Sequence, residues 1–128
     1  MTETATKTQP TQITALAFDC VDAARLAGFW AEVLGREVDE GADEKFAGIG
    51  FADPAAHSLH FLFEQVPEGK TAKNRVHPDL LVEDLETEVN RLLGLGATRL
   101  AELEIGKYRW VTLADPEGNE FDVVQAVG

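Results

Sequence analysis

The chain has 128 residues, of which 45% are hydrophobic, so it is long enough for one domain with a packed core. Its 23 acidic and 11 basic side chains give a net charge of −12, and such a field repels phosphate backbones and anionic membranes. Nucleic acid and membrane partners are therefore not expected. No apolar run approaches the roughly 20 residues that a membrane span needs.

The N-terminal residues 1–12 are polar and lack the apolar stretch of a signal peptide. They predict a disordered tail on a cytoplasmic protein, with a single domain over residues 13–128. The single Cys20 has no partner for an internal disulfide, and its apolar surroundings are typical of a small buried thiol.

The first half of the domain predicts a strand, a helix and three strands. Residues 13–20 form an apolar run of strand length, Asp22 is a good helix N-cap, and apolar side chains at helical spacing continue to Gly35. Alternating apolar residues separated by turn-rich segments then predict strands over 36–41, 46–52 and 58–64.

The second half predicts the same order after a linker, residues 65–75, that is rich in Pro, Gly and charge. Asp84 is the expected cap of its helix, and Gly94 to Gly96 should stop that helix. The strands of this half are predicted over 76–82, 98–102, 107–114 and 120–126.

A shift of 62 residues superposes the two halves. It places Asp53-Pro54 on Asp115-Pro116, and the apolar pattern follows the same register. The sequence therefore predicts an α+β fold of two repeated βαβββ modules, residues 13–64 and 76–126, that form a cupped, mixed eight-stranded sheet with helices on its outer face. Repeated units of this kind bury a shared face, and the groove between them is a natural binding site.

Strand alternation assigns side chains to the two faces of this sheet. The alternate positions that are purely apolar should meet the helices. They are Leu59, Phe61, Phe63, Val111, Leu113, Phe121 and Val123, joined by Leu16, Phe18, Leu80 and Val82 of the first strand of each module. The other alternate positions, which hold both polar and apolar residues, should line the cavity. There Trp110 and Tyr108 would form an aromatic wall beside Leu62 and Val124. Core packing is the alternative for Trp110, whereas Trp30 is expected in the core.

The same shift superposes Ala15 on His77 and His60 on Asp122, all on the cavity parity. His60, His77 and Asp122 make a set of two imidazoles and one carboxylate, which suits a divalent ion such as Fe, Zn, Ni or Mn. Each residue also has a structural alternative, because a His near a strand end often bonds only to neighbouring backbone.

Three segments of the chain are DCVDAARLAGFWAEVLG, KNRVHPDL and WVTLADPEGNEFDVV. Together they resemble the vicinal oxygen chelate superfamily, and within it the glyoxalase-like and bleomycin-resistance-like domains. The resemblance spans residues 13–126 and implies metal ligands on the first and last strand of each module. Those places match Ala15, His60, His77 and Asp122. Ala15 departs from the pattern, which disfavours a four-ligand glyoxalase I.

Two functions remain open from the sequence. The first is binding or sequestration of a small organic molecule in the central cavity, with no commitment to catalysis, and this reading tolerates Ala15. The alternative is a divalent-metal-dependent lyase, isomerase or dioxygenase that uses His60, His77 and Asp122. The reaction and the catalytic residues are not fixed, and homodimerisation is left open.

Overall fold

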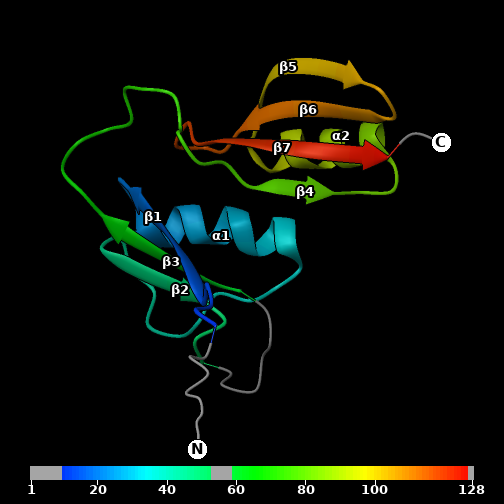
Figure 1. The fold of residues 1–128 in the computed structure, drawn as a ribbon. Coiled ribbons are helices and arrows are strands. Elements are labelled where there is room, and N and C mark those ends of the chain that lie inside the picture. The colour runs from blue at the N-terminus through cyan, green and yellow to red at the C-terminus, as the bar shows by residue number, and fades with distance from the viewer. Residues whose placement is uncertain (1–9, 53–58, 127–128) are drawn as a thin grey trace, which may run out of the picture.

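The computed structural model describes residues 10–52 and 59–126. In these residues seven strands form two mixed sheets, which pack with two helices (Figure 1). The elements in chain order are β1 (Ala15–Cys20), α1 (Ala23–Leu34), β2 (Phe46–Ile49), β3 (His60–Gln65), β4 (Asp79–Leu81), α2 (Leu85–Leu95), β5 (Thr98–Ile105), β6 (Tyr108–Ala114) and β7 (Glu120–Ala126). The α+β prediction is confirmed. The predicted tail and the turn at Asp53-Pro54 lie mostly or wholly outside the described residues.

The described strands are seven, not eight, because the strand predicted over 36–41 is reduced to a single bridge between Val38 and Ile49. A side chain in this region accepts hydrogen bonds from backbone N–H groups that would otherwise be available to pair with a neighbouring strand. The Asp39 carboxylate accepts from the N–H groups of Gly50 and Phe51, at 3.3 and 2.9 Å. The segment is therefore a loop held by a carboxylate.

The strands divide into two sheets with the orders β1-β3-β2 and β4-β7-β6-β5. The parallel pairs are β1 with β3 in the first sheet and β4 with β7 in the second. All other neighbouring strands are antiparallel. No ladder joins the two sheets within the described residues, so the predicted single eight-stranded sheet is wrong for one chain.

Both helices begin and end where the sequence predicts. Asp22 and Asp84 cap them, and their side chains accept from the backbone N–H groups of Arg25 and Thr87. Gly96 ends α2 with a positive φ of 119°, a conformation that side chains with a Cβ disfavour. No helix in the described ranges has the length and apolar character needed to cross a membrane.

Helix α1 lies between the two sheets (Figure 1). The Trp30 ring centroid is 5.4 Å from that of Phe18 in the first sheet and 4.9 Å from that of Phe121 in the second. The apolar parity predicted to meet the helices is buried, including Phe63, Phe121 and Val123. The first sheet packs its apolar face on α1, whereas the second packs its apolar face on α2 and reaches α1 through Phe121. The opposite face of each sheet is its open face.

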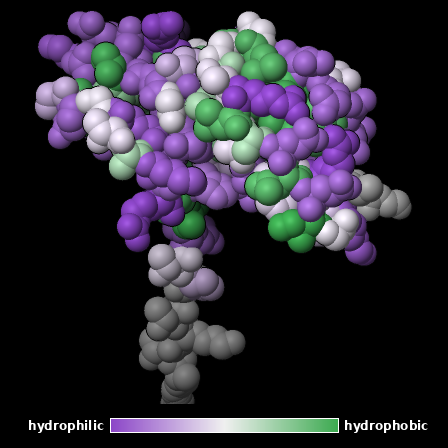
Figure 2. Space-filling model, turned by 90° about the horizontal axis from the view of Figure 1, so that it is seen from above, coloured by the Kyte–Doolittle hydropathy of each residue, from purple (hydrophilic) through white to green (hydrophobic). Residues whose placement is uncertain are grey.

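Polar contacts fix this arrangement. The Glu117 carboxylate accepts from the N–H groups of Val21 and Asp22, at 2.6 and 2.9 Å, and so ties the last turn of the chain to the start of α1. Arg91 of α2 donates to the carbonyl oxygens of Glu32 and Val33 at the end of α1. The surface seen from above is mostly hydrophilic, with small separate hydrophobic patches (Figure 2).

Candidate functional site

A hollow of about 280 Å³ lies on the open face of the second sheet. The alternation of β6 places Tyr108 and Trp110 on this face while Val111 and Leu113 are fully buried beneath it. The lining residues are Asp79, Ile105, Tyr108, Trp110, Asp122 and Val124. Three of the four residues predicted to bind a ligand therefore lie together, and we call this hollow the aromatic hollow.

Metal-ligating groups gather at one edge of the aromatic hollow. His77 Nδ1 lies 3.1 Å from Asp79 Oδ1 and 3.7 Å from Asp122 Oδ2. One ligating atom from each of the three residues lies within 4.8 Å of the other two. The Thr112 hydroxyl donates to Asp122 Oδ1 at 2.7 Å and so fixes the orientation of that carboxylate. An imidazole and two carboxylates are a donor set that fits a divalent ion.

Asp79 was missed by the sequence reasoning. The 62-residue shift superposes Ala15 on His77 and His60 on Asp122. Ala15 pairs with His60 in the first sheet, but in the second sheet the residue that pairs with Asp122 is Asp79. The Asp122 N–H donates to the Pro78 carbonyl at 3.0 Å, which sets this register. Strand period alone would have found Asp79, since it lies two residues beyond His77 and so on the same face.

The structure does not bring His60 into this cluster. His60 lies in β3 on the first sheet, with its ring centroid 4.9 Å from that of Phe51. Its Nδ1 is buried and has no hydrogen-bond partner among residues 10–52 and 59–126. Gly50, at a positive φ of 94°, makes room for it, since a Cβ there would lie 2.7 Å from His60 Nδ1 and would also clash with Arg36. Of the three predicted ligands, only His77 and Asp122 meet.

Leu62 lines a different hollow, of about 510 Å³, on the open face of the first sheet. Phe46 and Phe51 form much of its wall, and both side chains are about half exposed. The four residues predicted to bind one ligand are thus divided between two faces, because α1 separates the sheets.

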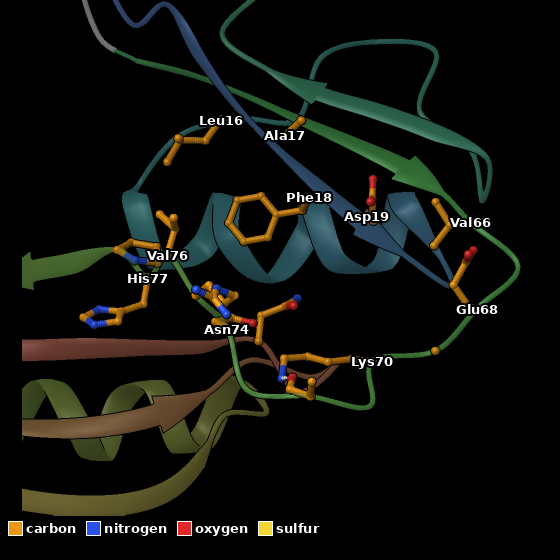
Figure 3. Close-up of a pocket in the computed structure, with 15 residues that line it drawn as sticks. Leu16, Ala17, Phe18, Asp19, Val66, Glu68, Lys70, Asn74, Val76 and His77 are labelled. Atoms are coloured by element: carbon orange, nitrogen blue, oxygen red, sulfur yellow. Dashed lines mark hydrogen bonds between the residues drawn. The ribbon is translucent and has the colours of Figure 1, made fainter.

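A third cavity of about 570 Å³ runs between β1 and the segment 66–78 (Figure 3). It extends from His77 at one end to Glu68 at the other, with Phe18 along its wall. Glu120 anchors the segment, since its carboxylate accepts from the Asn74 N–H at 2.9 Å and pairs with Lys70 at 3.2 Å. His77 therefore stands between this cleft and the aromatic hollow.

Cys20 offers no nucleophile, as the sequence predicts. The side chain is buried, and its thiol contacts the Glu64 carbonyl at 3.4 Å. Burial, with added repulsion from Glu117, Asp19 and Asp22, raises the pKa of the Cys20 thiol to about 11. The group is a neutral thiol at pH 7.

The family of the glyoxalase-like domain matches this chain over residues 15–124. The chain belongs to that family. The resemblance to the vicinal oxygen chelate superfamily is thereby confirmed, and the glyoxalase-like fold accounts for both sheets and both helices. No curated protein matches the sequence.

Three solved structures illustrate the likeness of this glyoxalase-like chain. A glyoxalase/bleomycin resistance protein/dioxygenase family enzyme from Burkholderia phytofirmans PsJN is 17% identical, with a TM-score of 0.72 over 91% of this chain and 100% of its own. Lactoylglutathione lyase from Agrobacterium tumefaciens is 15% identical, with a TM-score of 0.62 over 91% of this chain and 95% of its own.

The third is a mutant of the fosfomycin resistance protein FosX from Listeria monocytogenes, solved with Mn(II) and a dihydroxypropylphosphonic acid. It is 11% identical, with a TM-score of 0.69 over 90% of each chain. At these identities the three structures show a shared fold. The metal and the ligand are properties of FosX.

Proposed function

We propose that this glyoxalase-like protein binds a small organic molecule in the aromatic hollow. The observation that carries the proposal is the grouping of Trp110, Tyr108 and Val124 with two carboxylates on one open sheet face. Binding sites for small molecules typically combine apolar and aromatic walls with a few polar groups that orient the ligand. Trp and Tyr also offer flat surfaces against which a planar ligand stacks.

A second copy of the chain would close this hollow. Exposed apolar side chains occur on both open faces, with Phe46 on the first sheet and Leu81 and Ile105 on the second. Exposed apolar groups that cluster on one face mark interaction surfaces, and β1 and β4 are edge strands. We therefore include a homodimer in the proposal, in which the first sheet of one copy covers the second sheet of the other.

A metal-dependent lyase, isomerase or dioxygenase is the second candidate, and the cluster of His77, Asp79 and Asp122 favours it. A divalent ion held there would polarise a ligand oxygen as a Lewis acid. Thr112 orients Asp122, and Asp79 supplies a third donor beside His77 and Asp122. His60 would join this set only from a second copy, because its sheet faces the other way.

A fluorescence titration separates these candidates. The panel contains small organic molecules, and the proteins are the wild type, Trp110→Phe and Trp30→Phe, each with and without chelator. Trp110 lines the hollow, whereas Trp30 is 1% exposed and donates to Asp115. We expect a response that is lost in Trp110→Phe, kept in Trp30→Phe and indifferent to chelator. Dependence on an added divalent ion would favour the metal-dependent candidate, and a response that survives Trp110→Phe would place the site elsewhere.

A further inference from the structure

We infer that the ligand of the aromatic hollow is an organic cation, with an ammonium or guanidinium group on a compact apolar or aromatic body. This inference rests on the proposed function, because it assigns the chemical class of the molecule bound there. Three observations support it: the two carboxylates in the lining, the basic groups near those carboxylates, and the aromatic walls.

The charged side chains that line the hollow are both acidic. Asp79 and Asp122 face it from β4 and β7, and among the described residues no lysine or arginine lines it. Within the described residues neither carboxylate has an ion pair with a lysine or an arginine, and the one basic group paired with either is the imidazole of His77. A ligand anion would meet two carboxylates without a permanent cation, whereas a ligand cation would fill the gap between them.

Asp122 is the stronger of the two anchors. Its side chain is 15% exposed, against 59% for Asp79, so its interactions are less screened by water. Thr112 donates to Oδ1 only, whereas Oδ2 lies 3.7 Å from His77 Nδ1 and has no hydrogen bond within the described residues, so it can accept from a ligand N–H group. Hydrogen bonds between an ammonium group and a carboxylate are the strong, charge-assisted kind.

The aromatic walls favour the same ligand. A cation near the face of Trp or Tyr is attracted by the ring quadrupole, and Trp is the strongest partner of this type. Ile105 and Val124 supply apolar surface for the uncharged body. The volume of about 280 Å³ limits the ligand to a compact molecule, such as an arylalkylamine.

Three probes of nearly equal size test the inference: phenethylamine, phenethyl alcohol and phenylacetate. Binding to the wild type is measured by calorimetry and by Trp110 emission without added metal. We expect the amine to bind at least about tenfold more tightly than the alcohol, and the carboxylate not to bind. Asp122→Asn should weaken the amine about tenfold or more and weaken the uncharged alcohol by less. Asp19→Asn, an exposed aspartate in β1, is the control and should leave both unchanged.

The outcomes separate this inference from the function on which it rests. If the alcohol or the carboxylate binds as tightly as the amine and still perturbs Trp110, the hollow binds small molecules but the charge assignment is wrong. If none of the probes binds and Trp110 emission stays constant throughout the wider panel, both proposals fail. Mn²⁺ offers a further check, because an ion held by the same carboxylates should compete with the amine. Amine binding that is indifferent to both Mn²⁺ and Asp122→Asn would overturn the inference.

Discussion

Asp115 is the one charged side chain that is buried in the described part of the chain, at 2% exposure. One carboxylate oxygen accepts from the Trp30 indole N–H at 3.0 Å, and the other accepts from the backbone N–H groups of Glu117 and Asn119. These bonds compensate the cost of burying the charge. They also join the β6–β7 turn to α1, so this residue holds the two sheets in place.

Replacing Asp115 should therefore cost more than a surface change. Asp115→Ala leaves the Trp30 indole and two backbone donors without an acceptor, and we expect it to lower the free energy of unfolding by about 2–4 kcal/mol. Asp115→Asn retains one acceptor oxygen and should cost less. Urea denaturation measures both, with Asp19→Asn as the surface control. A loss below about 0.5 kcal/mol for Asp115→Ala would contradict this account.

Cys20 predicts a pH dependence. Its folded-state pKa is raised from 9.0 to about 11, so the protein disfavours the thiolate relative to the unfolded chain. The stabilising contribution is complete below the unfolded pKa and is lost as pH rises toward the folded pKa. We expect stability to fall on the order of 1–3 kcal/mol between about pH 9 and 11, and Cys20→Ala to lack this part of the slope. Equal slopes in both proteins would count against a buried thiol.

For single residues, the sequence predicts the face of the sheet on which a side chain lies better than the residue with which it pairs on the neighbouring strand. Alternation correctly places Trp110 and Tyr108 opposite the buried Val111 and Leu113. The 62-residue shift misses Asp79, because the hydrogen-bond register around Pro78 differs by two residues from the register of the first sheet. Register depends on which carbonyl accepts which N–H, and a pattern of residue types does not contain that information.

Among the elements, α2 is hydrogen-bonded to the end of α1 through Arg91. Arg91 pairs with Glu88 at 2.8 Å and donates to two carbonyl oxygens at the C-terminal end of α1. A cation there also complements the negative end of the helix dipole. The hydrogen bond from Arg91 holds the pKa of Glu88 below its ordinary value.

Arg91→Met should reduce stability by about 1–2 kcal/mol, because it leaves the carbonyl oxygens of Glu32 and Val33 to water alone. The Glu88 contribution should be present above the unfolded carboxyl pKa, about 4.3, and be lost as pH falls through the lower folded pKa. The mutant should therefore differ less from the wild type at pH 3 than at pH 7. Arg75→Met, at an exposed arginine, is the control. Denaturation curves at both pH values provide the measurement, and a cost that does not change with pH would refute the Glu88 linkage.

Element type is the part of the fold that the sequence predicts most closely. Both helices have the expected Asp caps and glycine ends, since capping is a local interaction between neighbours in sequence. The strand expected over 36–41 is lost because Asp39 bonds to the backbone beyond β2. That contact joins residues 11 and 12 positions apart, and alternation of residue types does not reveal it.

On the scale of the whole molecule, the repeat predicts two units but not how they meet. The apolar faces of the two sheets could be covered by the helices in more than one arrangement. In the structure α1 lies between the sheets (Figure 1). His60 and Leu62 are thereby separated from His77 and Trp110. This division is the physical reason for including a second copy in the proposed function.

The homodimer has a direct test. Leu81 is 79% exposed on β4 and lies on the open face of the second sheet, so Leu81→Lys should weaken association through that face. Leu100→Lys, at an exposed position outside the β5–β6 register, is the matched control. Light scattering after size exclusion should give a dimer for the wild type and the control, and a monomer for Leu81→Lys. A wild-type monomer at high concentration would exclude the dimer.

The binding site itself is tested most directly by NMR of the two tryptophan indole N–H groups, assigned with the Trp110→Phe and Trp30→Phe variants. Phenethylamine is titrated into the labelled protein first, followed by the other members of the panel. We expect the Trp110 resonance to shift in a saturable way, while that of Trp30, enclosed by aromatic rings and bonded to Asp115, does not move. A saturable shift of Trp30 with an unchanged Trp110, or no shift of Trp110 with any member of the panel, would contradict this expectation.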